Sequence, residues 1–168
     1  MKARVKLWTI GLLFSGWLCF LFLSQLAAQT SLHSDIAVVV HPDSLVRNLS
    51  LDELRQYFLG DRPHWKGRAK LRVVLVMPAQ GSRERDVLLK VIHEGVTEAQ
   101  FLAYWAAKDF RAEPVPSLRF VYSNREASEL VTANRGAIAL IYDRDVRPGL
   151  EKVAVDGRLP GEPGYPLR

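Results

Sequence analysis

The sequence predicts an α/β domain with a mainly parallel sheet that is flanked by helices. Short apolar runs without polar alternation, such as residues 35–41 and 137–142, predict strands that are buried on both faces. Segments that open with a helix-capping residue stand between these runs. Strands that alternate with helices are typical of a parallel sheet covered on both sides.

The first 28 residues differ in composition from the rest of the chain. An apolar run at 7–23 and small residues before Gln29 predict a signal peptide at 1–28, and its basic start consists of Lys2, Arg4 and Lys6. The uncharged stretch 7–28 also has the roughly 20 residues that span a bilayer, so an N-terminal membrane anchor remains the alternative. Both alternatives predict export of the remaining domain to the periplasm.

The charge and cysteine content exclude several classes of function. Three of the 23 basic residues and none of the 18 acidic ones lie in the leader, so residues 29–168 have 20 basic and 18 acidic residues, a net charge of +2. This balance does not favour nucleic-acid binding. The single cysteine, Cys19, lies in the apolar run, which excludes a disulfide and a thiolate site from the rest of the chain.

The remaining chain has the length of one ordinary domain. We expect an α/β domain at 29–156, followed by a tail at 157–168. This tail is rich in Gly and Pro, and we expect it to be loosely ordered.

The first half of the domain predicts two strands and the helix between them. After the strand at 35–41, Ser50 and Glu53 form a capping box that begins a helix up to about residue 59. A loop that contains Trp65 follows, and the apolar run 71–77 predicts the second buried strand.

The second half predicts three helices and three strands. Apolar residues at helical spacing predict a helix over 82–93, and Thr97 with Gln100 forms a capping box for the next helix, which has a stripe of aromatic residues. A third capping box, Ser123 with Glu126, begins a helix that ends near residue 134. The accompanying strands are expected at 118–122, at 137–142 and, as a short edge strand, at 152–155.

The turn after the second strand is the first candidate ligand site. Ligands of an open parallel sheet gather at the carboxyl ends of the strands, where helix N-termini favour anions. Positive charge is unfavourable in a first helical turn, and a bound anion would offset that cost. The candidate residues are Gly81, Ser82, Arg83 and Arg85. The alternative is a solvated helix start, with Glu84 partly neutralising the arginines. If an anion is bound, we expect replacement of Arg83 or Arg85 by Gln to leave the ligand-free domain at least equally stable.

Other candidate sites have less support. Ser123 follows the third strand and is a second candidate for ligand contact, although Glu126 already explains it as a helix cap. The four histidines have no metal-ligand spacing, and the sequence contains neither a nucleophile elbow nor a phosphate-cradling loop ending in Gly-Lys-Ser or Gly-Lys-Thr. We therefore expect no metal, no cofactor and no enzymatic activity.

Four motifs also occur in a characteristic order along the chain. They are the segment 49–60 with Trp65, the strand that leads into Gly81-Ser82, the segment 100–105 and the segment 131–138. In this order, over residues 35–156, the chain resembles the substrate-binding proteins of phosphate ABC transporters. The resemblance implies a type 2 periplasmic binding protein fold, in which two α/β lobes close on a ligand held by backbone amides and hydroxyls at helix N-termini.

The chain departs from that family in its length and in one loop. It is about half as long as a two-lobed binding protein, which predicts a single lobe. The family's phosphate loop typically has Ser-Gly-Thr where this chain has Gly81-Ser82-Arg83. The resemblance implies an exported protein that binds phosphate or another small oxyanion for an ABC-type uptake or sensing system. The alternative is a periplasmic interaction or sensory module for a membrane partner, with no small ligand.

Overall fold

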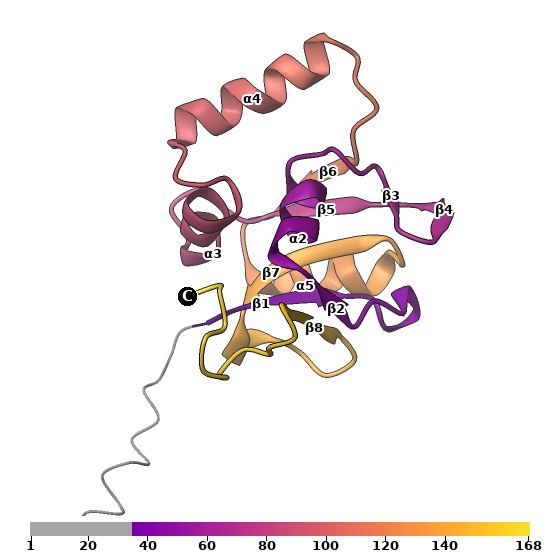
Figure 1. Ribbon diagram of the computed structural model, residues 1–168, viewed down its shortest axis with the longest axis vertical. Coiled ribbons are helices and arrows are strands. Elements are labelled where there is room, and N and C mark those ends of the chain that lie inside the picture. Colours follow the sequence, from indigo (N-terminus) through magenta and orange to yellow (C-terminus); the bar gives the residue numbers. More distant parts are fainter. Residues whose placement is uncertain (1–34) are drawn as a thin grey trace, which may run out of the picture. The chain divides into compact units, whose positions relative to one another are not determined.

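The computed structural model describes residues 35–168, and the predicted leader at 1–28 lies outside these residues. Helices and strands alternate over most of this range, as expected for an α/β fold (Figure 1). The strands are β1 (Ile36–Val40), β2 (Asn48–Leu49), β3 (His64–Trp65), β4 (Arg68–Arg72), β5 (Val74–Met77), β6 (Ser117–Phe120), β7 (Ala137–Tyr142) and β8 (Glu151–Val155). The α-helices are α2 (Leu51–Phe58), α3 (Arg83–Val87), α4 (Glu98–Phe110) and α5 (Asn124–Ala133).

Six of these strands form the main sheet, in the order β2-β8-β1-β7-β5-β6. Strands β7, β5 and β6 are parallel to one another, and β8 pairs in parallel with β2. Because β1 is antiparallel to both β7 and β8, it opposes the other five strands of this sheet. The prediction of a mainly parallel sheet is confirmed.

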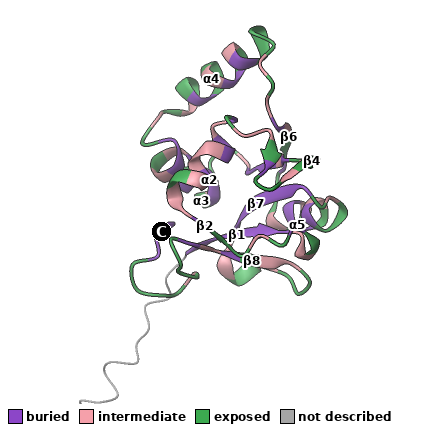
Figure 2. Ribbon diagram, turned by 45° about the vertical axis from the view of Figure 1, so that its right-hand side comes forward, coloured by how far each residue is buried: buried purple, intermediate pink, exposed green. Residues whose placement is uncertain are grey.

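The sheet is covered on both faces, as the uninterrupted apolar strands predicted. Along β1, alternate residues contribute to two separate clusters of buried side chains, one on each face. The larger cluster is packed under α2, α3 and α4, and the smaller one under α5. All five residues of β1 are therefore buried, and Figure 2 shows β1 and β7 in the colour of buried residues.

Two strand predictions need correction. The segment 152–155 is not an edge strand, because the two-residue strand β2 pairs outside β8. The expected strand at 71–77 is divided at Val73 into β4 and β5. Strand β4 pairs with β3 in a separate two-stranded sheet, so the expected loop around Trp65 is a hairpin. No residue of β4 is buried, and its charges alternate with Ala69 and Leu71, whereas β5 is continuously apolar and mostly buried.

The predicted helix starts are confirmed with one difference. The capping boxes of Ser50 with Glu53 and Thr97 with Gln100 are both present. At α5 the Ser123 hydroxyl accepts from the Glu126 amide, but the Glu126 carboxylate accepts from the Tyr122 amide instead of returning to Ser123. The helix expected at 82–93 consists of α3 followed by a π-helical turn at Leu88–Ile92.

The C-terminal tail is ordered by contacts with β1, so the expectation of a loosely ordered tail is wrong. The Tyr165 and Leu167 side chains are buried in the larger cluster. The Ile36 amide donates to the Leu167 carbonyl at 2.9 Å, and the Tyr165 hydroxyl donates to the Ile36 carbonyl at 2.8 Å. The Gly161 amide also donates to the Asp35 carboxylate at 2.7 Å, so apolar and polar contacts together hold this segment. Within residues 35–168, no helix is long and apolar enough to cross a membrane.

Candidate functional site

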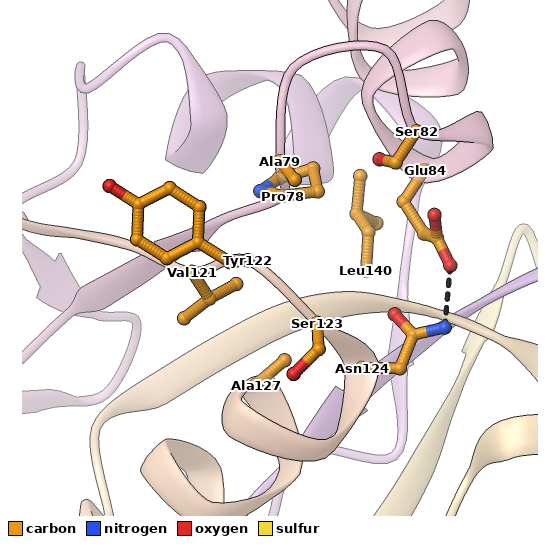
Figure 3. Close-up of a pocket in the computed structure, with 10 residues that line it drawn as sticks. All are labelled: Pro78, Ala79, Ser82, Glu84, Val121, Tyr122, Ser123, Asn124, Ala127 and Leu140. Atoms are coloured by element: carbon orange, nitrogen blue, oxygen red, sulfur yellow. Dashed lines mark hydrogen bonds between the residues drawn. The ribbon is translucent and has the colours of Figure 1, made fainter.

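A small pocket lies at the carboxyl ends of β5, β6 and β7. It has a volume of about 170 Å³ and is bounded by the loop after β5, the start of α3 and the loop from β6 into α5. Figure 3 shows its lining residues, which are Pro78, Ala79, Ser82, Glu84, Val121, Tyr122, Ser123, Asn124, Ala127 and Leu140. The parallel direction of the three strands brings both predicted helix starts to the same edge of the sheet.

Ser82 and Ser123 are the two predicted site residues that line this pocket. Each serine is the N-cap of its helix, since the Ser82 hydroxyl oxygen accepts from the Arg85 amide and that of Ser123 accepts from the Glu126 amide. A serine hydroxyl that accepts in this way keeps its own hydrogen to donate. Amides at the start of a helix have no acceptor within that helix. The pocket thus combines hydroxyl donors with the positive ends of two helices.

Glu84 supplies a buried carboxylate to the lining. Its side chain is 6% exposed, and its Oε1 atom accepts from Asn124 Nδ2 at 2.7 Å and from the Tyr142 amide at 3.2 Å. These bonds connect α3 to the start of α5 and to the end of β7. The Asn124 Nδ2 atom also donates to Asp145 at 2.9 Å. In Figure 3 the Glu84 and Asn124 side chains point toward one another, and a dashed line marks their hydrogen bond.

Arg85, a predicted ligand residue, lies in a buried ion pair outside the pocket lining. Its side chain is 3% exposed, its Nη2 atom lies 2.6 Å from Glu98 Oε1 and its Nε atom lies 3.1 Å from Glu98 Oε2. The guanidinium carbon stands 3.9 Å from the centre of the Phe101 ring, a cation–π contact. The hydrogen bonds from Arg85 lower the pKa of Glu98 below its usual value. The pair joins α3 to α4, which gives Arg85 a structural role.

Gly81 and Arg83 also lie outside the lining. Gly81 has φ +78°, and a Cβ atom there would meet no atom within 4 Å. The turn therefore requires glycine for its backbone conformation and not for a close approach. Arg83 is exposed at the first position of α3. Of the five predicted residues, the structure brings Ser82 and Ser123 together.

Glu84 and Asn124 line the pocket but were not predicted. The sequence interpretation treated Glu84 as a partner for the neighbouring arginines and assigned no ligand role to Asn124, which follows the candidate Ser123. Their hydrogen bond joins residues 40 positions apart, and only the neighbouring positions of β5 and β6 bring them together. A carboxylate two positions after a predicted site serine was the one available sign.

The pocket differs from a typical anion site in its charge. Its ten lining residues, all in the described part of the chain, include one carboxylate and no Lys, Arg or His. A ligand there would meet the hydroxyls of Ser82 and Ser123 and the Glu84 carboxylate within the same lining. Among residues 35–168, no group of three or more acidic, His or Cys side chains is arranged to hold a metal ion.

Comparison with known proteins gives similarity at the level of structure. No family model and no curated protein sequence matches the chain. A Clostridium perfringens protein assigned as a phosphate ABC transporter substrate-binding protein, solved with bound phosphate, aligns over 79% of this chain and 51% of its own, with 22% identity and a TM-score of 0.60. A Vibrio cholerae ABC-type phosphate transport receptor aligns over 75% of this chain and 48% of its own, with 20% identity and a TM-score of 0.58. PstS from Borrelia burgdorferi has 14% identity, a TM-score of 0.56 and coverages of 75% and 49%.

These similarities establish the fold, which is the α/β fold of periplasmic binding proteins. The chain spans about half the length of the solved structures it matches. The predicted similarity to phosphate-transporter binding proteins is thus confirmed for the fold, over part of those proteins.

Proposed function

We propose that this chain is an exported solute-binding domain that takes a small oxyanion, hydrogen phosphate first, in the pocket between Ser82 and Ser123. The observation on which this depends is a pocket at two helix starts, whose lining contains two serine hydroxyls and a buried carboxylate. Its volume of about 170 Å³ is below the roughly 300 Å³ at which sites for drug-sized ligands begin, which suits a small ligand. The matched structures are named as phosphate-binding transport proteins, and one has phosphate bound.

The buried carboxylate of Glu84 defines which oxyanions are suitable. A fully deprotonated oxyanion beside a carboxylate brings two acceptors and two negative charges together, which is unfavourable at low dielectric. An oxyanion that keeps a proton can donate that proton to the carboxylate in a charge-assisted hydrogen bond. Hydrogen phosphate keeps a proton near neutral pH and sulfate does not. We therefore expect the pocket to favour phosphate over sulfate.

The proposal includes a membrane partner and no catalysis. A binding domain of this kind delivers its ligand to a transporter or reports it to a sensor in the inner membrane. None of the residues that line the pocket forms a nucleophile and base pair, and the hydroxyls of Ser82 and Ser123 bond to backbone amides. Export depends on the predicted leader at 1–28, and N-terminal sequencing of the exported protein distinguishes cleavage from anchoring.

The test measures the melting temperature of the exported protein with sodium phosphate and, separately, with sodium sulfate at equal ionic strength. A ligand at 100 times its dissociation constant adds about 2.7 kcal/mol to the stability of a protein that it binds only when folded. Phosphate should raise the melting temperature more than sulfate does. Glu84→Gln should reduce this preference, because the amide oxygen still accepts from Asn124 but the charge is removed.

Asp145→Asn is the matched control, since Asp145 also accepts from Asn124 but does not line the pocket. The control variant should keep the preference of the original chain. Equal stabilisation by phosphate and sulfate in the original chain, or none by any oxyanion at millimolar concentration, would contradict the proposal.

A second candidate function is an interaction module, and the exposed aromatic residues beside the pocket favour it. Phe120, the last residue of the edge strand β6, is 53% exposed, and Tyr122, two residues later in the pocket lining, is 86% exposed. Exposed aromatic side chains beside an unpaired strand edge are suited to pairing with another chain. A photo-cross-linker at position 122 that captures one membrane protein in cells, together with no effect of oxyanions, would favour this candidate.

A further inference from the structure

A second concave surface lies at the opposite end of the strands from the serine pocket. It has a volume of about 520 Å³ and is lined by Asp43, Arg135 and the segment from Gly67 to Leu71. This segment belongs to the β3–β4 hairpin, which only Val73 separates from β5, and only Gly136 separates Arg135 from β7. In Figure 1 the hairpin and α3 lie on opposite sides of the view, with the sheet between them. We call this surface the basic hollow.

Three cationic side chains meet in the basic hollow, from two segments far apart in the sequence. Arg68 and Lys70 come from β4, and Arg135 comes from the turn after α5. Arg68 Nη1 donates to the Asp43 carbonyl at 2.9 Å, and Arg135 Nε lies 3.3 Å from the Asp43 carboxylate. One residue thus orients both guanidinium groups. Each guanidinium has five N–H donors, so most of these donors are left for a ligand.

The cations in the basic hollow exceed the anions. Asp43 is the only acidic residue in the lining, against Arg68, Lys70 and Arg135. Lys70 is exposed, and within residues 35–168 its ammonium group has no hydrogen bond or ion pair. The lining therefore carries an excess of two positive charges.

The basic charge is segregated on this part of the domain. Residues 62–72 contain five Lys or Arg residues and no acidic residue. The other residues of 35–168 have 15 basic and 18 acidic side chains, so the domain outside the hairpin is net negative. The net charge of the whole domain is close to zero, so it did not indicate this separation of basic and acidic residues. Such a local field attracts anions, and salt screens the attraction.

The hairpin is fixed against the turn that contains Arg135. The buried indole of Trp65 donates to the Gly136 carbonyl at 3.1 Å. The Val74 amide donates to that same carbonyl at 2.9 Å. A Cβ atom at Gly136 would lie 2.1 Å from the Arg72 carbonyl oxygen, so the two backbones are in direct contact. The two backbone segments that carry the cations are therefore fixed relative to one another before any ligand arrives, which lowers the entropic cost of binding.

We propose that the basic hollow binds a polyanion with two or more phosphate groups. Arginine presents a planar fork of donors that matches phosphate oxygens, and two arginines with a lysine between them suit a ligand with several phosphate groups. The same chemistry occurs in a free oligophosphate and in the headgroups of anionic phospholipids. Charged residues on an edge strand also prevent aggregation, but that role does not require Arg135, which lies outside the strand, or a hollow between the two segments.

The test measures binding of tripolyphosphate to the exported protein by calorimetry at low salt. Vesicles of phosphatidylcholine with and without phosphatidylglycerol, tested by co-sedimentation, distinguish a lipid headgroup from a free oligophosphate. A poly-glutamate peptide of similar charge tests whether phosphate is required. The variant combines Lys70→Gln with Arg135→Gln. Its control combines Lys90→Gln with Arg125→Gln.

The control residues match the tested residues in exposure. Arg125 is 74% exposed and Arg135 73%, and each is paired with one carboxylate. Lys90, like Lys70, is exposed. Arg125 and Lys90 line neither pocket.

We expect the Lys70/Arg135 variant to lose at least about tenfold in affinity for one phosphate ligand, which corresponds to about 1.4 kcal/mol. The control variant should stay within about twofold, and Ser82→Ala should have no effect on this binding. Binding of tripolyphosphate without vesicle binding identifies a free oligophosphate, and the reverse identifies a lipid headgroup. The proposal is overturned by equal losses in the two variants, by equally tight binding of poly-glutamate, or by no binding of any phosphate ligand at millimolar concentration.

Discussion

Replacement of Glu98 by Gln tests whether Arg85 is a structural residue or a ligand residue. The Arg85 side chain is 3% exposed and donates twice to Glu98, whose side chain is 23% exposed. Glu98→Gln removes the negative charge and leaves the guanidinium buried against Phe101. Loss of one partner from a fully buried ion pair costs about 3–5 kcal/mol. Because water reaches part of Glu98, we expect a loss of about 2–3 kcal/mol.

Replacement of the other partner, Arg85, should cost less stability than replacement of Glu98. Arg85→Met leaves Glu98, which water can partly solvate, and fills the same space with an apolar chain, so we expect a loss of about 1–2 kcal/mol. Each kcal/mol corresponds to roughly 4 °C in melting temperature for a domain of this size. The sequence interpretation predicts the opposite for Arg85, since removal of a positive charge from a helix start would leave the ligand-free domain equally or more stable.

The assay is urea unfolding at neutral pH of both single variants and the double variant, which forms a double-mutant cycle. The double variant should lose less than the sum of the single losses. Because the pKa of Glu98 is lowered in the folded state, its contribution is full above the usual carboxyl pKa and declines as pH falls through the lowered value. Phosphate-induced stabilisation should persist in Arg85→Met. A fully stable Arg85→Met variant that no longer responds to phosphate would refute this reasoning and support Arg85 as a ligand residue.

Two further predictions concern a buried histidine and the C-terminal tail. Burial lowers the pKa of His93 to about 4, so between pH 6.5 and 4 the unfolded chain binds a proton that the folded domain does not. The free energy of unfolding should therefore fall by up to about 3 kcal/mol over this range. His93→Gln should flatten this dependence of stability on pH, whereas His64→Gln, at an exposed position, should not. Identical profiles for the two variants would contradict the prediction. Leu167 is fully buried and Leu159 is 42% exposed, so Leu167→Ala should cost about 2–5 kcal/mol and Leu159→Ala less than about 1 kcal/mol in urea unfolding. Similar losses for the two leucine variants would show that the tail is not anchored.

Local patterns were sufficient for the regular elements of the domain. Ser50 and Thr97 begin their helices as predicted because a capping box involves residues only three positions apart. The apolar runs identified β1 and β7 because burial on both faces removes the alternation of polar and apolar residues. At 68–72 charged residues alternate with Ala69 and Leu71, so the apolar run was taken to begin at Leu71. One strand was therefore predicted at 71–77 in place of β4 and β5, and the hairpin was missed.

The candidate site was predicted in part, for a similar reason. Ser82 and Ser123 were found because each follows a strand and caps a helix, and both features are local. Arg85 was assigned from the same local rule, but its side chain turns away to Glu98, 13 residues later. The rule that positive charge is unfavourable at a helix start considers only the dipole of that helix. It does not include a carboxylate that another helix places beside the arginine, as α4 does with Glu98.

The sequence by itself determined the α/β class, the order of its main helices and buried strands, and the two serine-capped helix starts, because these depend on contacts within a few residues. The tertiary structure decided the direction of β1, the meeting of Glu84 with Asn124 and the gathering of Arg68, Lys70 and Arg135 around Asp43. These features depend on which strands become neighbours in the sheet. Strand order reflects the packing of the whole core, and no single segment of the chain encodes it.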